Sequence, residues 1–174
     1  HKKRNLYKRF TRDYQYQVSF INLKSTESQE EILDVFDQWR LAKGKKLSGV
    51  KKELRTLTAC FDLVHHNHLH LMTVTVQNKI AGFSIFELVN KNYAILHFQK
   101  NNPGYIGINE FLMRELCNHL VSQKIKFLNL EQDMGEERLR YSKRSYRPFK
   151  LLKKYRIIEK IIPIDKSQEI SNLR

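Results

Sequence analysis

The sequence predicts an α/β (α+β) fold in which a mixed, mostly antiparallel sheet is flanked by helices. Three observations support it: apolar residues alternate in short segments, recur every three or four residues in longer ones, and the two kinds of segment follow each other along the chain. The 174 residues, 41% of them hydrophobic, can build a single sizeable core. We therefore expect one domain at residues 15–165, a basic helical lead-in at 1–14 and a polar tail at 166–174.

The expected elements run from a strand near the N-terminus to a strand near the C-terminus. Turn residues bound the strands and capping signals bound the helices, and three antiparallel strands form a meander ahead of a crossover helix. In chain order the expected elements are strand 16–23, helix 25–44, helix 50–64, strands 69–77, 80–89 and 93–99, helix 108–122, strand 125–133, helix 134–146 and strand 149–161.

Local signals refine these elements. Ser28 and Glu31 have the spacing of a capping box at the start of the first long helix. In the first strand of the meander the apolar alternation slips between Leu71 and Met72, which indicates a β-bulge. Five apolar residues of the crossover helix are expected to face the core: Ile108, Phe111, Leu112, Leu116 and Leu120.

Charge is the strongest signal in the composition. The chain contains 32 Lys and Arg against 18 Asp and Glu, a net charge of +14. Two basic segments, residues 1–12 and 138–156, contain no acidic residue. Such an excess is typical of proteins with a polyanionic partner, either nucleic acid or an anionic membrane surface. A charged surface that only aids solubility has the same composition, so both interpretations stay open.

Hydropathy and cysteine usage bear on location. No apolar run approaches the roughly 20 residues that cross a bilayer, and no leader-peptide pattern is present. Cys60 and Cys117 lie far apart at apolar positions of expected helices, without a disulfide pattern. These features predict a cytoplasmic protein, at most peripheral at the inner membrane face. Because the chain begins with His1 rather than methionine, we expect it to be part of a longer protein with an upstream region.

One stretch, residues 128–148, places acidic residues before a glycine and basic residues after it. If the strand reaches Asp133, alternation puts Asn129, Glu131 and Asp133 on one face, with the two carboxylates about 7 Å apart. One carboxylate could then act as a general base, and the other could orient it or bind an ammonium group. Alternatively, Asp133 and Glu136 form a capping box for the next helix, which needs no chemistry. No such structural explanation applies to Glu131.

A row of basic side chains is expected on the next helix. Arg140, Lys143 or Arg144, and Arg147 recur at spacings of three and four, so they lie on one face before Pro148 ends the helix. Beside a cleft, Arg would offer forked donors to a phosphate and Lys a point charge. A solvated helix face has the same spacing, so this alternative also stays open.

Other candidate motifs predict no chemistry. The four histidines within 65–70 lack an accompanying cysteine or carboxylate, so a polar helix end is favoured over a zinc site. Neither cysteine is near an evident base, which argues against nucleophilic catalysis. The loop at 99–107 joins a strand to a helix, where acyltransferases cradle a pyrophosphate, but Gly104 and Gly107 lack the spacing that acetyl-CoA-dependent enzymes use. We expect no cofactor and no metal.

Residues 127–155, FLNLEQDMGEERLRYSKRSYRPFKLLKKY, resemble the signature of the phosphatidylglycerol lysyltransferase C-terminal domain family. That signature reads N-x-E-x-D, a hydrophobic residue, G-x-x-G-L-R-x-x-K-x-S-Y-x-P and a basic K-K-Y. Arg138 departs from it, because the family usually has glycine there, and weaker similarity extends back to the N-terminal lead-in. The matching residues are Asn129, Glu131, Asp133, Gly135, Leu139, Arg140, Lys143, Ser145, Tyr146, Pro148, Lys154 and Tyr155.

The resemblance implies a GNAT-like acyltransferase fold, usually the second of two such units in one protein. Well-understood members move an aminoacyl group from a charged tRNA to the headgroup of phosphatidylglycerol. The implied partners are therefore charged tRNA, an anionic membrane surface or phospholipid acceptor, and an upstream GNAT-like domain of the same protein. The implied catalytic residues are Glu131, Asp133, Arg140 and Lys143. The implied substrate-binding residues are Asn129, Ser145, Tyr146, Arg147 and Lys154.

We therefore expect an aminoacyl-tRNA-dependent acyltransferase, whose acceptor need not be a lipid. A basic surface suits the phosphates of a tRNA acceptor stem, and an ester donor needs no loop for pantetheine. Two alternatives remain. One is an acyl-CoA-dependent GNAT N-acyltransferase, and the other is a non-catalytic module that binds RNA or an anionic surface.

Overall fold

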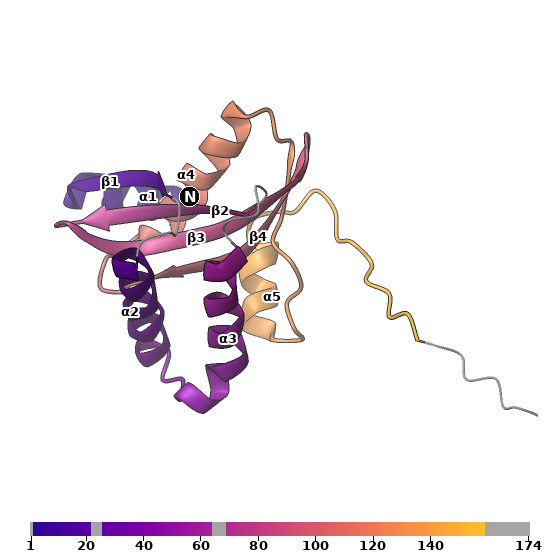
Figure 1. Cartoon of the computed structure of the whole chain (residues 1–174). Helices are drawn as coiled ribbons and strands as arrows, with labels where there is room; N and C mark the ends of the chain where they lie inside the picture. Colours follow the sequence, from indigo (N-terminus) through magenta and orange to yellow (C-terminus); the bar gives the residue numbers. More distant parts are fainter. Residues whose placement is uncertain (1, 22–25, 64–68, 159–174) are drawn as a thin grey trace, which may run out of the picture. The chain divides into compact units, whose positions relative to one another are not determined.

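The computed structural model describes residues 2–21, 26–63 and 69–158 of the chain (Figure 1). In chain order its elements are α1 (Lys2–Asp13), β1 (Tyr16–Ile21), α2 (Thr26–Ala42), α3 (Leu47–Leu63), β2 (Leu69–Val76), β3 (Lys79–Asn90), β4 (Tyr93–Asn101), α4 (Ile108–Ser122), β5 (Phe127–Asn129) and α5 (Glu137–Arg144). The chain divides into two compact units, His1–Gln132 and Asp133–Arg174. None of the described helices combines the length and hydropathy that a membrane crossing requires.

The first unit is built on one five-stranded sheet with the strand order β1-β2-β3-β4-β5. The strands from β1 to β4 pair antiparallel, and β5 pairs parallel with β4. A parallel pair requires a long crossover, and α4 supplies it between β4 and β5. The predicted mixed, mostly antiparallel sheet is confirmed.

Helices cover both faces of this sheet. Figure 1 shows α2 and α3 on one face and α4 on the other. The core on the α4 side contains Phe10 of α1 and Phe111 of α4, both fully buried. The core on the opposite side contains Ile32 of α2 and Leu57 of α3, also fully buried. The helical lead-in is therefore part of the packed first unit, because its phenylalanine belongs to the core.

Burial on both faces corrects the bulge predicted between Leu71 and Met72. These two residues are buried in opposite cores, and their register with β3 is regular. The irregularity of β2 lies between Val74 and Thr75 instead. Consecutive apolar residues on β2 follow from its central place between two helical layers, because each face of a covered strand needs an apolar side chain.

The crossover helix α4 matches its predicted range, and all five of its expected core residues are at most 3% exposed. The helix α2, by contrast, begins at Thr26, so Ser28 and Glu31 lie inside it and the predicted capping box is wrong. A residue within a helix has helical backbone angles, whereas an N-cap residue has an extended backbone. Hydrophobic spacing therefore placed the helix correctly while the capping signal did not.

Two predicted strands differ from the structure. The strand β5 contains only three residues, because the chain turns after Asn129 and Glu131 has a φ of +59°. Residues 149–158 of the predicted last strand are exposed and form no strand, while 159–161 lie outside the described residues. A strand needs a neighbour for its backbone hydrogen bonds. The described part of the second unit contains the helix α5 and no strand.

Candidate functional site

The first unit gathers one histidine between two carboxylates. Nδ1 of His97 lies 2.8 Å from Oε1 of Glu131, and Nε2 of His97 lies 3.0 Å from Oε2 of Glu87. The side chains of the histidine, Glu87 and Glu131 are 27%, 38% and 46% exposed, so the group is partly buried and still open to solvent. We call these three residues the His97 cluster.

Strand register places His97 beside Glu87. The residue Glu87 pairs with Ile95, and the register of β3 with β4 shifts between Ile85 and Phe86. This shift leaves His97 as an extra residue on β4, because its two neighbours are the ones that pair with β3. A bulge re-aims the side chain of the extra residue, which brings the imidazole to the carboxylate of the adjacent strand.

A turn after β5 brings the second carboxylate to the histidine. The Glu131 backbone N–H donates a hydrogen bond to Oδ1 of Asn129 at 2.7 Å, which closes a short side-chain turn. The left-handed φ of Glu131 completes the change of direction. Asn129 is therefore a residue that shapes the site, while Glu131 is the residue whose carboxylate reaches His97.

The same turn separates β5 from β4. Within the described residues, pairing of the two strands covers only Tyr93–Ile95 with Phe127–Asn129, although β4 continues to Asn101. The half of β4 that begins at His97 therefore has no β5 partner. The His97 cluster lies where the two strands part, and ligand-binding clefts of α/β sheets form at the carboxyl ends of strands whose neighbours separate.

The chemistry of the cluster follows from the two ring nitrogens. A singly protonated imidazole donates from one nitrogen and accepts at the other, whereas a doubly protonated ring donates from both. Contacts to two carboxylates therefore suit the doubly protonated ring, or a ring that releases one of its carboxylates to a substrate. The arrangement can hold or move one proton, and its carboxylates can bind a cationic group.

The second unit contains a separate ion pair within the motif. Nε of Arg140 donates to Oδ2 of Asp133 at 2.6 Å, and the Gly135 N–H donates to Oδ1 of the same carboxylate at 3.0 Å. These two hydrogen bonds, the one from Arg140 being the larger cause, lower the pKa of Asp133 to about 2. The carboxylate correspondingly raises the pKa of Arg140. Asp133 is therefore a fixed acceptor that is fully ionised at neutral pH.

Asp133 does not cap the following helix. The N-cap of α5 is Glu136, and its side chain makes no capping hydrogen bond. The backbone N–H of Glu136 instead donates to the backbone oxygen of Asp133 at 2.9 Å. The predicted capping box is therefore wrong, because the carboxylate of Asp133 accepts hydrogen bonds from the Gly135 N–H in the preceding turn and from the Arg140 side chain of α5 instead.

The remaining predicted site residues lie on or just after α5. Arg140 and Lys143 are on the helix, Ser145 is its C-cap, and Arg147 follows it with a φ of +54°. The basic row is thus shorter than predicted, and the helix ends at Ser145 rather than at Pro148. Tyr146 is half-buried, whereas Lys154 lies in the exposed segment beyond the helix.

The structure brings the predicted residues together in two groups, one in each unit. In the first unit Glu131 meets Glu87 and His97, which the sequence did not single out. In the second unit Asp133 meets Arg140. The missed pair did carry a signal, because Glu87 interrupts the apolar run 85–89 and His97 interrupts the apolar and aromatic run 93–98. Nothing in the sequence indicated that the register of two strands would align them.

Similarity to known proteins assigns the chain to a family. The model of the family described as "Phosphatidylglycerol lysyltransferase, C-terminal" matches residues 1–158. The chain belongs to this family. Its members and the GNAT acetyltransferases share the fold seen here. No curated protein sequence matches the chain.

Solved structures support the fold of this family member. A conserved protein of unknown function from Bacteroides thetaiotaomicron is 26% identical, with a TM-score of 0.75 over 87% of this chain and 50% of that one. The C-terminal domain of a protein assigned as a lysylphosphatidylglycerol synthetase, from Agrobacterium fabrum, is 14% identical, with a TM-score of 0.53 over 75% of this chain and 40% of that one. The chain thus spans about half the length of these relatives or less.

Acetyltransferases share the fold at lower identity. PaiA N-acetyltransferase from Thermoplasma acidophilum, solved in complex with coenzyme A, is 13% identical, with a TM-score of 0.61 over 79% of this chain and 91% of that one. An acetyltransferase of the GNAT family from Desulfovibrio desulfuricans is 14% identical, with a TM-score of 0.61 over 76% of this chain and 82% of that one. These likenesses confirm the predicted GNAT-like fold.

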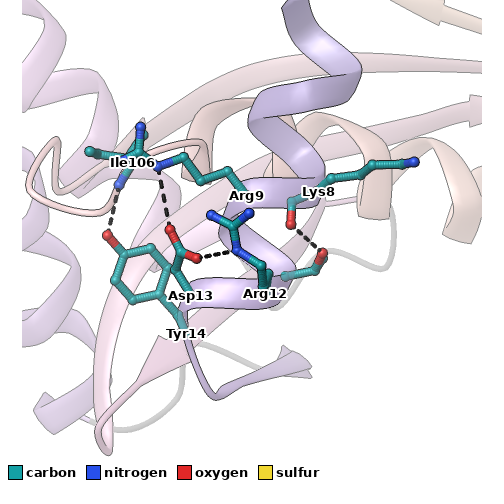
Figure 2. Close-up of polar contacts among 7 residues, drawn as sticks. Lys8, Arg9, Arg12, Asp13, Tyr14 and Ile106 are labelled. Atoms are coloured by element: carbon teal, nitrogen blue, oxygen red, sulfur yellow. Dashed lines mark hydrogen bonds and ion pairs between the residues drawn. The ribbon is translucent and has the colours of Figure 1, made fainter.

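The loop before α4 differs in this family member from an open phosphate-binding loop. Gly107 has a φ of +89°, and a Cβ at this position would lie 2.1 Å from the backbone oxygen of Leu6 in α1. The loop is also tied down by the Ile106 N–H, which donates to the hydroxyl oxygen of Tyr14 at 3.2 Å (Figure 2). The glycine therefore serves a close approach between α1 and the start of α4.

The other sequence candidates carry no site in the described chain. His65, His66 and His68 lie outside the described residues, and His70 stacks on Phe86 with the ring centroids 5.3 Å apart. Among the residues that the structure describes, no group of His, Cys, Asp or Glu could hold a metal ion. Burial raises the pKa of both cysteine thiols, and a thiol with a raised pKa is a poor nucleophile.

Proposed function

We propose that the chain transfers an aminoacyl group from a charged tRNA to an acceptor such as the headgroup of phosphatidylglycerol. The observation that carries this proposal is the position of Glu131. This carboxylate of the family motif lies beside His97, where β4 and β5 part. An aminoacyl ester carries an α-ammonium group, which a partly buried carboxylate can bind. An acetyl group offers no such charge.

Charge supports a tRNA donor. The chain carries a net charge of +14, with two basic segments that contain no acid. Lys and Arg side chains bind the phosphates of an acceptor stem and release counterions as they do so. The affinity for tRNA should therefore fall steeply as the salt concentration rises. The reaction belongs to the cytoplasm, where charged tRNA is made. An upstream GNAT-like domain in the same protein would fit relatives that are about twice as long as this chain.

The loop before α4 favours an ester donor over coenzyme A. A pyrophosphate needs free backbone N–H groups at a helix N-terminus. Here α1 packs against that end: the Leu6 oxygen faces Gly107, and Nζ of Lys3 lies 4.0 Å from Glu110 in the first turn of α4. The loop also lacks the glycine spacing of acetyl-CoA-dependent enzymes. An acyl-CoA-dependent transferase remains the alternative that coenzyme A binding would reveal.

The proposal is tested by transfer assays on the full chain. The donors are total tRNA charged with radiolabelled amino acids, and the acceptors are vesicles that contain phosphatidylglycerol. We expect Glu131→Gln and Arg140→Ala to lower transfer by at least about tenfold, because each removes a charge from a motif side chain that is already held in place. The control Glu110→Gln removes a half-buried carboxylate elsewhere in the first unit.

Unchanged transfer in both motif variants would show that these residues are not the site. Thermal stabilisation by coenzyme A, with none by tRNA, would support the acyl-CoA-dependent alternative. A tRNA complex that weakens with salt and never loses its aminoacyl group would support a non-catalytic binding module.

The C-terminal segment supports a second role, peripheral binding to an anionic membrane. Residues 149–158 expose large apolar side chains and four basic ones, and contain no acidic residue. The exposed fraction reaches 89% at Phe149 and 97% at Ile157. Apolar residues interleaved with Lys and Arg suit a surface of anionic lipids, each cation contributing about 1 kcal/mol.

Vesicle flotation tests this second role. We expect the full chain to float with vesicles rich in phosphatidylglycerol and not with vesicles of phosphatidylcholine. Replacement of Lys150, Lys153 and Arg156 by glutamine should reduce the floated fraction several-fold. Equal flotation with both lipids, or no effect of the replacement, would contradict an electrostatic membrane contact.

A further inference from the structure

We propose that His97 is the base that takes the proton from the acceptor hydroxyl, with Glu87 as its positioning residue and Glu131 as the residue that binds the donor's α-ammonium group. This inference rests on the proposed function and adds a division of labour within it. Its basis is the geometry of the His97 cluster, in which one imidazole contacts carboxylates on two different elements.

The two carboxylates differ in how firmly they are held. Glu87 belongs to β3 and pairs with Leu69 of β2 on one side and with Ile95 of β4 on the other. Glu131 follows the end of β5, has a left-handed φ and is the most exposed member of the cluster. The contact between Nε2 of His97 and Glu87 is therefore the fixed one. The contact with Glu131 is the one that a substrate can replace.

The fixed contact sets the tautomer of the ring. Once Glu131 has left the ring and the Nδ1 proton has passed to solvent, the neutral His97 keeps its other proton on Nε2, where it is donated to Glu87. The lone pair of Nδ1 then faces the space that the Glu131 carboxylate has left. A carboxylate that orients a histidine in this way also stabilises the protonated ring that forms during the reaction. The arrangement supplies a base once Glu131 turns its carboxylate to a cationic substrate.

An α-ammonium group is the substrate feature that would release Nδ1. Glu131 would exchange its contact with the ring for a charge-assisted hydrogen bond to that group. Nδ1 of His97 then accepts the proton of the acceptor hydroxyl while the hydroxyl oxygen attacks the ester carbonyl carbon. The new ester bond forms as the bond to the terminal ribose oxygen of the tRNA breaks. The protonated His97 returns its proton to that ribose oxygen, so that no oxidant or further reactant is needed.

The closing experiment separates the three roles by kinetics, with tRNA charged with radiolabelled amino acids and phosphatidylglycerol vesicles as substrates. We expect His97→Ala to lower kcat by about 100-fold or more, and added imidazole to restore part of the loss. Glu87→Gln should lower kcat by at least about tenfold with little change in the donor KM, because an amide can favour the wrong tautomer. Glu131→Gln should mainly raise the KM for the charged tRNA.

Controls keep a folding defect apart from a catalytic one. Each variant is compared with the wild type by thermal unfolding, and Glu87→Asp tests whether a shorter carboxylate rescues part of the activity. Glu110→Gln is the matched carboxylate control in the first unit, where it contacts Lys3 rather than a histidine.

Three outcomes would overturn the inference. A wild-type chain that transfers no aminoacyl group would overturn the proposed function and the assignment of His97 together. A wild type that transfers while His97→Ala keeps its rate within about twofold would overturn the assignment alone. A slow His97→Ala variant that imidazole does not rescue would make the histidine structural rather than catalytic.

Discussion

The sheet of the first unit and the motif segment of the second differ in what determines them. The first unit has large side chains that are fully buried on both faces of its sheet, such as Phe36 and Phe111. In the second unit no described residue from 133 to 158 is buried, although this segment carries the most recognisable sequence of the chain. A recognisable motif and a stabilising core are therefore separate properties. Burial of apolar side chains explains the structure of the first unit, whereas ion pairs and backbone turns explain that of the motif segment.

The largest contrast is expected from truncating apolar residues. Phe111 is fully buried and its ring centroid lies 4.5 Å from those of Phe10 and Tyr16. We expect Phe111→Ala to lower the free energy of unfolding by about 3–5 kcal/mol. Leu151 is 68% exposed, and Leu151→Ala should change it by less than about 0.5 kcal/mol. Urea unfolding of both variants measures this, and equal losses would contradict the contrast.

Two glycines with positive φ allow a sharper comparison. Gly107 and Gly135 have φ values of +89° and +80°. A Cβ at Gly107 would collide with the Leu6 backbone, whereas one at Gly135 would meet nothing within 4 Å. Backbone strain plus the collision should cost Gly107→Ala about 3 kcal/mol, and strain alone in an exposed turn should cost Gly135→Ala about 1 kcal/mol. Thermal and urea unfolding compare the two, and a more harmful Gly135→Ala would reverse the interpretation.

The N-cap of α5 lacks a side-chain hydrogen bond, so a better capping residue should stabilise the helix. Glu136 holds the N-cap position with an extended backbone and without a capping hydrogen bond. Glu136→Ser should stabilise the first turn of α5 by about 0.5–1 kcal/mol, because a serine side chain accepts a hydrogen bond from the exposed backbone N–H groups. Hydrogen exchange of the Arg140 amide, which donates to the Glu136 oxygen, should slow accordingly. Unchanged exchange would show that the cap does not limit the helix.

The smallest effect concerns the titration of Asp133. Its pKa is lowered to about 2, chiefly by the hydrogen bond from Arg140. The ion pair therefore favours the folded turn above the ordinary carboxyl pKa, and this contribution disappears as the pH falls from about 3.8 through about 2. Carbon-detected NMR should give a midpoint near 2 for Asp133, and Arg140→Ala should move it upward. If Arg140→Ala left the Asp133 midpoint unchanged, the hydrogen bond from Arg140 would not be the cause of the lowered pKa.

Much of the fold could be predicted because hydrophobic periodicity reports burial directly. The five core residues of α4 and the order of helices and strands up to β5 follow from spacing alone. The predictions that depended on short polar signals failed. Ser28 and Asp133 both resemble helix caps in sequence, but one lies within a helix and the other is held by Gly135 and Arg140. A polar side chain can satisfy several partners, so its spacing does not decide which one it meets.

The candidate site could be predicted from the sequence only in part, for the same reason. Family resemblance identified Glu131, and strand alternation was expected to continue through it to Asp133. The turn at Glu131 ends the strand and separates the two carboxylates into different hydrogen-bonded groups. Alternation holds only while a strand is paired, and pairing is a property of the sheet.

The sequence alone was sufficient to predict the helices and strands up to β5, the excess of positive charge and the family to which the chain belongs. Periodicity, composition and motifs can be read from neighbouring residues, without knowledge of which segments pack together. The meeting of Glu87, His97 and Glu131, by contrast, is a product of the tertiary structure. Their contact depends on a shift of register between β3 and β4 and on a turn after β5. Register is fixed by the packing of a whole sheet, so no local pattern could reveal it.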